Sequence, residues 1–253
     1  MRIIINCDDL GASETVNDAI LEMMEQSRVT SATLMMNAPA IEDAVRRIGS
    51  FPHCSFGVHL NVTEFAPLSA HPGLRTLLNE KGEFAGNARS RPIDIPLTAH
   101  AREGVYAEWC AQIERAQALG VPISHLDSHH HVHTRAGLFS VLKRVQRRFG
   151  IRKVRLRRNV PGPHPTLRNR LHFARHWPWN FALRHLFVTR TTDGFAPFSL
   201  FHQRLQAGLG YASSIELMCH PGRGRYAAET ALLRGPWREM LREETKLISY
   251  NDL

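Results

Sequence analysis

Aspartate and histidine side chains follow four apolar segments of this chain, where predicted strands end. They are Asp8 and Asp9 after residues 2–7, His59 late in 56–62, Asp127 with the cluster His129, His130, His131 and His133 after 123–126, and His220 after 215–219. The carboxyl ends of parallel strands share one face, and α/β barrels build their active sites on that face. The four segments together therefore predict one site made of carboxylates and imidazoles.

These residue types suit a catalytic divalent metal ion. One carboxylate and two imidazoles can hold such an ion and leave positions open for water and substrate. Hydrolysis of an amide needs an activated water and a stabilised oxyanion, both of which a metal can supply. A second carboxylate can then act as the general base, and a histidine on the opposite wall can protonate the leaving nitrogen. We therefore expect a metal-dependent hydrolase.

Each of these residues or clusters, taken alone, could also have a purely structural role. Paired acids such as Asp8 and Asp9 often form a turn or a helix cap, and a lone histidine such as His59 is more often a core or loop residue. The histidine cluster at 129–133 resembles an affinity tag, but it lies inside the chain between a predicted strand and a predicted helix. The prediction of a site depends on the joint placement of these residues.

The order of apolar and amphipathic segments predicts how these residues are positioned. Strands are expected at 2–7, 31–37, 56–62, 123–127, 153–157 and 214–219, and helices after Ser13 and at 41–48, 99–119, 137–149 and 229–248. Strand and helix alternate, which is typical of a parallel α/β barrel or a doubly wound sheet. A length of 253 residues suits a single barrel domain. Residues 64–96 are rich in Gly and Pro and are expected to form loops or lids over the site.

Composition narrows the class of protein. With 43% hydrophobic and 22% charged residues, the chain is typical of a globular domain, and no apolar run is long enough to span a membrane. The N-terminal sequence MRIIINCDDL lacks the features of a signal peptide, so we expect a cytoplasmic protein, with the inner membrane face as an alternative location. Four scattered cysteines are expected to be free buried thiols.

Four motifs resemble those of the YdjC-like carbohydrate deacetylases, a family that includes chitooligosaccharide and hopanoid-associated deacetylases. They are NCDDLG at 6–11, GVHL at 57–60, LDSHHHVH at 126–133 and MCHPG at 218–222. VTSAT at 29–33 and GEF at 82–84 also look like family features. The resemblance covers nearly the whole chain and is weakest from about 157 to 209. Leu10 stands where the family commonly has Phe, which changes packing only.

The resemblance implies a TIM-like (β/α) barrel, irregular in form, that removes acetyl groups from N-acetylated sugars of the N-acetylglucosamine type. It implies Asp9, His59 and His129 as ligands of one divalent metal ion, and so selects His129 among the clustered histidines. By the same similarity Asp8 is the general base and His220 the general acid.

Other roles around this site are less specific. The resemblance places Asp127 behind the ligands, where it orients a histidine or binds substrate, and leaves His131 and His133 either to line the pocket or to orient ligands. The family is usually described with Mg²⁺, whereas an Asp-His-His set is chemically more natural for Zn²⁺ or another transition metal.

Positive charge is concentrated in one part of the chain. The formal net charge is +9, and 14 Lys or Arg residues lie between Lys143 and Arg190 with no acidic residue from 128 to 192. This region contains HWPWNF at 176–181, and we expect a basic, Trp-containing insertion or lid at about 157–209 within the single domain 1–253. Aromatic residues among arginines suit an anionic membrane surface or a sugar on a lipid or phosphate carrier. The alternative is a solvated basic face with its tryptophans packed in the core.

Two other functions are compatible with parts of the sequence. A metal-dependent hydrolase of another ester or amide would use the same site. A nucleic-acid-binding protein would explain the net charge of +9. It would not explain Asp and His at four strand ends, and no familiar nucleic-acid motif is visible, so no nucleic-acid partner is expected. The oligomeric state stays open, with a homodimer as one alternative.

Overall fold

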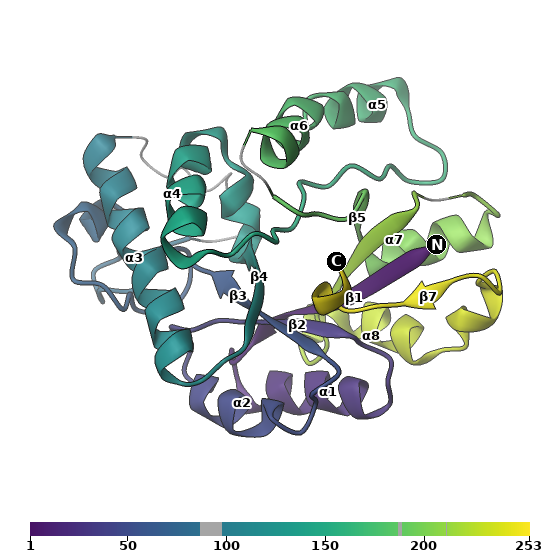
Figure 1. The fold of residues 1–253 in the computed structure, drawn as a ribbon, viewed down its shortest axis with the longest axis horizontal. Coiled ribbons are helices and arrows are strands. Elements are labelled where there is room, and N and C mark those ends of the chain that lie inside the picture. The colour runs from purple at the N-terminus through teal and green to yellow at the C-terminus, as the bar shows by residue number, and fades with distance from the viewer. Residues whose placement is uncertain (87–97, 187–188, 211) are drawn as a thin grey trace.

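A curved sheet of parallel strands forms the centre of the protein. The computed structural model describes residues 1–86, 98–186, 189–210 and 212–253. The strands are β1 (Arg2–Leu10), β2 (Ser31–Leu34), β3 (Ser55–Leu60), β4 (Ile123–Ser128), β5 (Gly194–Pro197), β6 (Ser214–Cys219) and β7 (Lys246–Leu247). Their order is β4-β3-β2-β1-β6-β5, with β7 also paired to β1 (Figure 1). Every pairing between these strands is parallel, so their carboxyl ends share one face.

Irregular segments continue the sheet beyond β4. Val154 forms a parallel bridge with Leu126 of β4, and Lys153 forms one with Arg190. Farther along, the Asn159 side chain accepts from the Phe195 backbone at 2.9 Å and donates to the Asp193 carbonyl at 2.9 Å. The half-barrel of regular strands is thus extended toward β5 by poorly paired backbone. This confirms the predicted TIM-like barrel and its irregular form.

Helices surround the sheet, as expected for a parallel α/β fold. They are α1 (Glu14–Glu25), α2 (Ile41–Ile48), α3 (Ala99–Ala118), α4 (Phe139–Phe149), α5 (Leu167–Ala174), α6 (Trp177–His185), α7 (Phe198–Gln206) and α8 (Ala227–Arg234). The Ser13 hydroxyl accepts from the Val16 backbone N–H at 3.3 Å and so caps α1, as the sequence predicts. No helix of the described residues is long and apolar enough to cross a bilayer.

Two predicted elements differ from the structure. The helix expected at 229–248 is wrong beyond Arg234, where Gly235 and Pro236 end α8 and the chain continues as a 3₁₀ turn and β7. A Pro cannot donate the backbone hydrogen bond that a continuing helix needs. The strand expected at 153–157 has only isolated bridges. The helices α5 and α6 lie between about 161 and 190, where the sequence pattern assigns no element, and β5 and α7 are not predicted either.

Other expectations are confirmed or stay predictions. All four cysteines are free and buried. The 64–96 stretch has little regular structure up to residue 86 apart from a 3₁₀ segment (Pro72–Leu77), and its last ten residues lie outside the described ranges. The insertion or lid expected at 157–209 stays a prediction.

The packing of β3 depends on a glycine. A Cβ atom at Gly57 would lie 2.6–2.8 Å from the ring of His125, which is itself stacked on Tyr250 with ring centroids 3.5 Å apart. Both neighbouring rings are fully buried, so neither can move aside into solvent. Only a residue without a side chain fits between β3 and β4 at this position.

We therefore expect Gly57→Ala to lower the free energy of unfolding by about 1–3 kcal/mol through overpacking, measured by urea denaturation. Gly49→Ala is the matched control, because a Cβ there meets nothing within 4 Å and the backbone has ordinary helical angles. Its stability should change by less than about 1 kcal/mol. Equal stability of the two variants would show that the His125 contact does not constrain the fold.

Candidate functional site

The end of β1 carries two carboxylates into the same buried site. Adjacent residues of a regular strand point to opposite faces. Here Asp9 has φ = 71°, in the left-handed region that a non-glycine residue rarely adopts, and the pairing of β1 with β2 shifts register between Cys7 and Leu10. Asp8 and Asp9 are both buried, and their carboxylates lie 3.9 Å and 3.4 Å from Nε2 of His59. The irregular backbone at Asp9 thus places two neighbouring acids around one histidine.

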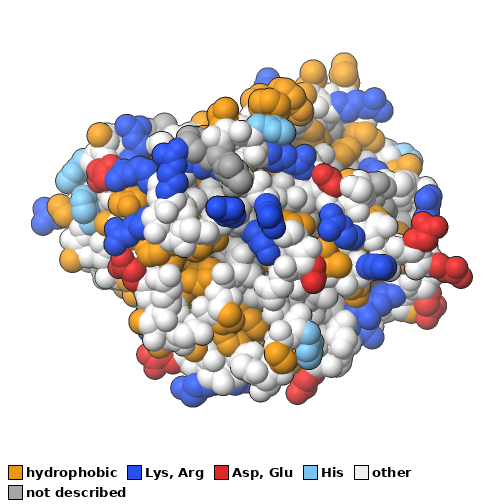
Figure 2. Space-filling view, in the orientation of Figure 1, with side chains coloured by type: hydrophobic (Ala, Val, Ile, Leu, Met, Phe, Trp, Pro, Cys, Tyr) orange, Lys and Arg blue, Asp and Glu red, His pale blue; other side chains and the backbone are white. Residues whose placement is uncertain are grey.

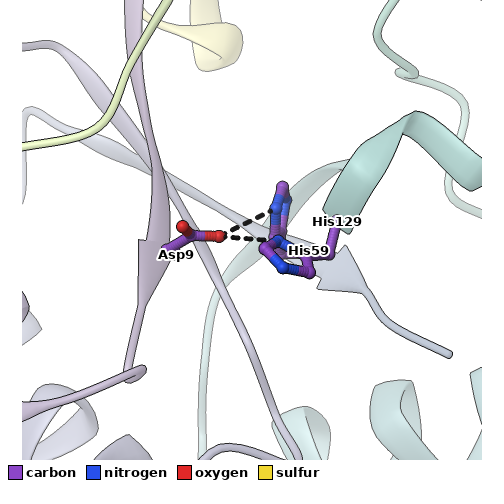
Figure 3. Close-up of side chains that lie close together, drawn as sticks. All are labelled: Asp9, His59 and His129. Atoms are coloured by element: carbon purple, nitrogen blue, oxygen red, sulfur yellow. Dashed lines mark ion pairs between the residues drawn. The ribbon is translucent and has the colours of Figure 1, made fainter. Parts of the chain in front are cut away.

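Three side chains from three separate segments converge on one point (Figure 3). The Oδ1 atom of Asp9 lies 3.4 Å from Nε2 of His59 and 2.8 Å from Nδ1 of His129. All three ligand atoms lie within 4.8 Å of one another, and all three residues are buried. Asp9 comes from β1 and His59 from β3, and His129 follows β4. The structure therefore brings together the three residues that the resemblance implies as metal ligands.

The orientation of His59 is fixed from behind. Its Nδ1 atom lies 2.7 Å from Oδ1 of Asp127 and 3.1 Å from the hydroxyl of Thr33. A carboxylate in this position accepts a hydrogen bond from Nδ1–H and leaves the Nε2 lone pair facing forward, as it does for metal-bound histidines. Asp127 thus lies behind His59 and fixes the orientation of its ring.

A buried arginine holds the carboxylates in place. Arg155 is fully buried, and its guanidinium donates to both oxygens of Asp8 at 2.6–2.7 Å. The same group lies 2.7 Å from Asp127 and 2.7 Å from Glu216. Three carboxylates from β1, β4 and β6 therefore share one positive charge. A buried charge is tolerated only when it is paired in this way.

The charges shift the protonation of the site. Burial raises the pKa of Asp8, but Arg155 and His59 together outweigh it and hold this pKa below its ordinary value. The pKa of Asp127 is lowered for the same reason. Burial lowers the pKa of His59, yet Asp127 and Asp8 together raise it to about 10. The charges of the site thus stabilise the ionised form of its aspartates and the protonated form of His59.

His220 follows the end of β6 and approaches Asp8. Its Nε2 atom lies 3.9 Å from Oδ2 of Asp8, and its Nδ1 atom lies 3.4 Å from Glu229. Its backbone N–H also donates to Glu229 at 3.0 Å, and its ring stacks on Tyr226 at 4.1 Å. His220 is therefore held by a carboxylate behind it, with its other nitrogen facing the site.

The remaining histidines of the cluster separate into different environments. His133 is buried, with Nδ1 2.6 Å from the Ser128 hydroxyl and Nε2 3.2 Å from the backbone oxygen of Arg155. His131 packs edge-on against Phe195, and its buried Nδ1 has no hydrogen-bond partner among the described residues. Positive φ angles at His130 and His131 let consecutive side chains point in different directions.

Sequence reasoning missed several charged residues of the site, among them Arg155, Glu64 and Arg223. Arg155 was counted with the basic segment, although its apolar neighbours Val154 and Leu156 are a sign of burial. Glu64 lies 3.3 Å from Nε2 of His129, and Arg223 donates to Asp9 at 3.0 Å. Both belong to loops, where no periodic pattern indicates which way a side chain points.

The donor set fits a divalent metal ion. Oδ1 of Asp9 is buried and has no hydrogen bond in the described structure, although Nδ1 of His129 lies only 2.8 Å away. Two polar atoms this close without hydrogen-bond geometry are expected when both face a common cation. Ligand atoms about 2.0–2.2 Å from one ion lie about 3 Å apart, which matches the separations from Asp9 to His59 and His129.

Two curated relatives are similar to a large part of this chain. A carbohydrate deacetylase of Geobacillus stearothermophilus is 40% identical over 168 residues, which are 65% of this chain and 63% of that protein. A carbohydrate deacetylase of Vibrio campbellii is 36% identical over 151 residues, 60% of this chain and 57% of that protein. The matched segment thus spans about three fifths of each of these relatives.

The match to a solved structure and the match to a family model both cover more of the chain than the curated relatives do. A crystal structure from Enterococcus faecalis V583, provisionally assigned to cellobiose-phosphate cleavage, has a TM-score of 0.72 at 22% identity and covers 99% of this chain and 98% of that one. This likeness shows the fold. The model of the YdjC-like proteins matches residues 2–245. Since that match includes all four motifs and almost the whole length, the chain belongs to the YdjC-like protein family.

Proposed function

We propose that this protein is a metal-dependent carbohydrate N-deacetylase that releases acetate from an N-acetylated sugar of the N-acetylglucosamine type. The main observation behind the proposal is that Asp9, His59 and His129 converge on one point. Next to this cluster, Oδ2 of Asp8 lies 3.9 Å from Nε2 of His220. The name of the curated relatives, carbohydrate deacetylase, supports the same activity.

Asp9, His59 and His129 would hold the metal. A divalent cation in this position would lower the pKa of a water molecule and polarise the acetyl carbonyl oxygen. Two nitrogen donors and one carboxylate favour Zn²⁺ or another transition metal, whereas resemblance to the family favours Mg²⁺. Asp127 orients His59 through its 2.7 Å contact and so supports the ligand set without joining it.

Asp8 would act as the general base. Arg155 keeps its carboxylate ionised, and Oδ2 lies 3.9 Å from a nitrogen of the ligand His59. Asp8 accepts a proton from the attacking water while the new C–O bond forms at the acetyl carbon. The bidentate contact with Arg155 also fixes the direction in which the carboxylate faces.

His220 would act as the general acid. Glu229 contacts Nδ1 and leaves Nε2 free to face the substrate. When the C–N bond breaks, Nε2–H donates its proton to the departing nitrogen, and the products are acetate and the free amine of the sugar. His133 uses both ring nitrogens on Ser128 and Arg155, so we assign it to positioning Arg155. His131, whose Nδ1 atom has no hydrogen-bond partner among the described residues, stays a candidate pocket residue.

Acetate release tests the proposed activity. Chelated protein, resupplied with Zn²⁺, Mg²⁺ or no metal, would be offered N-acetylglucosamine, its oligomers and a simple acetyl ester. We expect acetate from an N-acetylated sugar only when metal is present. Hydrolysis of the ester alone would favour the alternative, a hydrolase of another bond. Absence of acetate release from every sugar with every metal would contradict the deacetylase proposal.

Asp8→Asn separates proton transfer from metal binding. The amide keeps the size of the carboxylate but cannot accept a proton at neutral pH, so kcat should fall by about 10²- to 10⁴-fold. Metal content, measured by mass spectrometry of the purified protein, should stay unchanged. The exposed Asp18→Asn is the control, and its kcat should equal that of the unaltered protein. Near-normal turnover of Asp8→Asn would remove Asp8 as the base.

His220→Ala tests the general acid through the leaving group. An amine must be protonated as it departs, whereas nitrophenolate leaves without a proton. Replacement of His220 should therefore lower kcat for the N-acetylated sugar by about 10²- to 10⁴-fold and affect 4-nitrophenyl acetate far less. The exposed His53→Ala serves as the control. Equal losses on both substrates, or loss of bound metal, would overturn the assignment of His220.

A further inference from the structure

Exposed apolar side chains gather on two neighbouring helices. Of the eight exposed large apolar residues in the described structure, five lie in α5, in α6 or directly after α6. They are Leu167, Leu171, Trp177, Phe181 and Leu186, with Leu167 74% and Trp177 64% exposed. Figure 2 shows apolar side chains along the upper edge of the molecule, where Figure 1 places α5 and α6, with Lys or Arg side chains beside them.

The spacing of the apolar residues along α6 places the exposed ones on one face of the helix and the buried ones on another. Trp179 and Leu183 are four residues apart on α6 and are buried, and Trp179 packs edge-on against Phe139 of α4. Trp177 and Phe181 are also four residues apart, stack on each other at 5.1 Å and face away from the core. Residues at this spacing share one face of a helix. The helix α6 thus has two apolar faces, and the described residues cover only one of them.

The orientation of α6 is fixed by hydrogen bonds. The Asn180 side chain accepts from the backbone N–H of Arg157 at 3.0 Å and donates to its backbone oxygen at 2.9 Å. These contacts anchor the helix to the segment that carries Arg155. The outward direction of Trp177 and Phe181 therefore follows from the fold.

The charge beside the apolar face is positive. Arg168, Arg170 and Arg175 are exposed and form no ion pair with any carboxylate of the described residues. The chain has no acidic residue from 128 to 192, so no neighbouring carboxylate in this stretch offsets them. An apolar face flanked by unpaired arginines is complementary to a surface that is apolar inside and anionic at its rim.

We propose that the face of α5 and α6 formed by Leu167, Leu171, Trp177, Phe181 and Leu186 docks on an anionic lipid bilayer. Trp and Phe side chains favour the boundary between headgroups and acyl chains, and arginines bind the lipid phosphates. The helices have eight and nine residues, so they lie in the interface without crossing the bilayer.

A second copy of the chain is the competing occupant. A symmetric dimer through this face would place Arg168, Arg170 and Arg175 of one chain close to the same residues of the other. Like charges held together in an apolar contact oppose association. An anionic lipid surface would bury the apolar side chains of this face and also pair with its arginines. A second copy would bury the apolar side chains but would bring like charges together.

Vesicle flotation of the full chain tests the proposal. Vesicles of equal parts phosphatidylglycerol and phosphatidylcholine should carry the protein, and vesicles of pure phosphatidylcholine should carry far less. Partitioning should fall on the order of tenfold or more for Trp177→Ser with Phe181→Ser, and for Arg168→Glu with Arg175→Glu. Both pairs lie at exposed positions, so the variants should fold normally.

Matched controls are available on the same chain. Met240→Ser with Leu119→Ser removes apolar side chains that are 42% and 37% exposed elsewhere, and Arg75→Glu with Arg242→Glu makes the same charge change at exposed sites outside the two helices. Both controls should bind vesicles as the unaltered protein does. Because Trp109, Trp179 and Trp237 are buried, a blue shift of tryptophan emission on binding should come from Trp177 and disappear in Trp177→Phe.

Three outcomes would overturn the proposal. One is absence of binding to anionic vesicles at low salt. Another is equal partitioning of the helix variants and their controls. The third is a dimer in sedimentation velocity without lipid that dissociates in Trp177→Ser with Phe181→Ser, which would assign the face to a second copy.

Discussion

The site depends on one buried positive charge. Arg155 is fully buried and contacts Asp8, Asp127 and Glu216, each at 2.6–2.7 Å. These carboxylates belong to β1, β4 and β6, so the contacts connect strands on both sides of the barrel. Without the guanidinium, three buried acids would lie together with no fixed counter-charge, which proteins tolerate only by protonation or rearrangement. The irregular segment after β4 is therefore essential to the site, although it forms little regular sheet.

The single positive charge of Arg155 does not neutralise all the buried carboxylates around it. Asp8 and Asp127 are held ionised, and the neighbouring Asp9 also has a lowered pKa. The remaining negative charge raises the pKa of His59 to about 10, so this imidazole would bind a proton at neutral pH. A divalent cation between Asp9 and the two histidines would offset the same excess of negative charge. The arrangement that orients Asp8 thus also favours a metal ion beside it.

The sequence predicted the parts of the site that follow regular strands. Asp9, His59 and His129 were identified because strand ends of an α/β barrel share one face and because the motifs resemble a known family. Arg155 was missed because its burial is decided by three acids that are distant in the sequence. The left-handed backbone at Asp9, which brings both aspartates together, has no sequence signal of its own. The basic segment likewise combines a buried Arg155 with exposed helices, a distinction that composition cannot make.

Calorimetric titration of metal-free protein with Zn²⁺ and Mg²⁺ tests the central claim most directly, because it measures the ion that the whole cluster is inferred to hold. We expect one ion per chain for the unaltered protein and for the exposed-site variant His53→Ala, and no binding at the same concentrations for His129→Ala. Undiminished binding by His129→Ala, or no binding of either ion by the unaltered protein, would contradict the assignment of Asp9, His59 and His129 as a metal site.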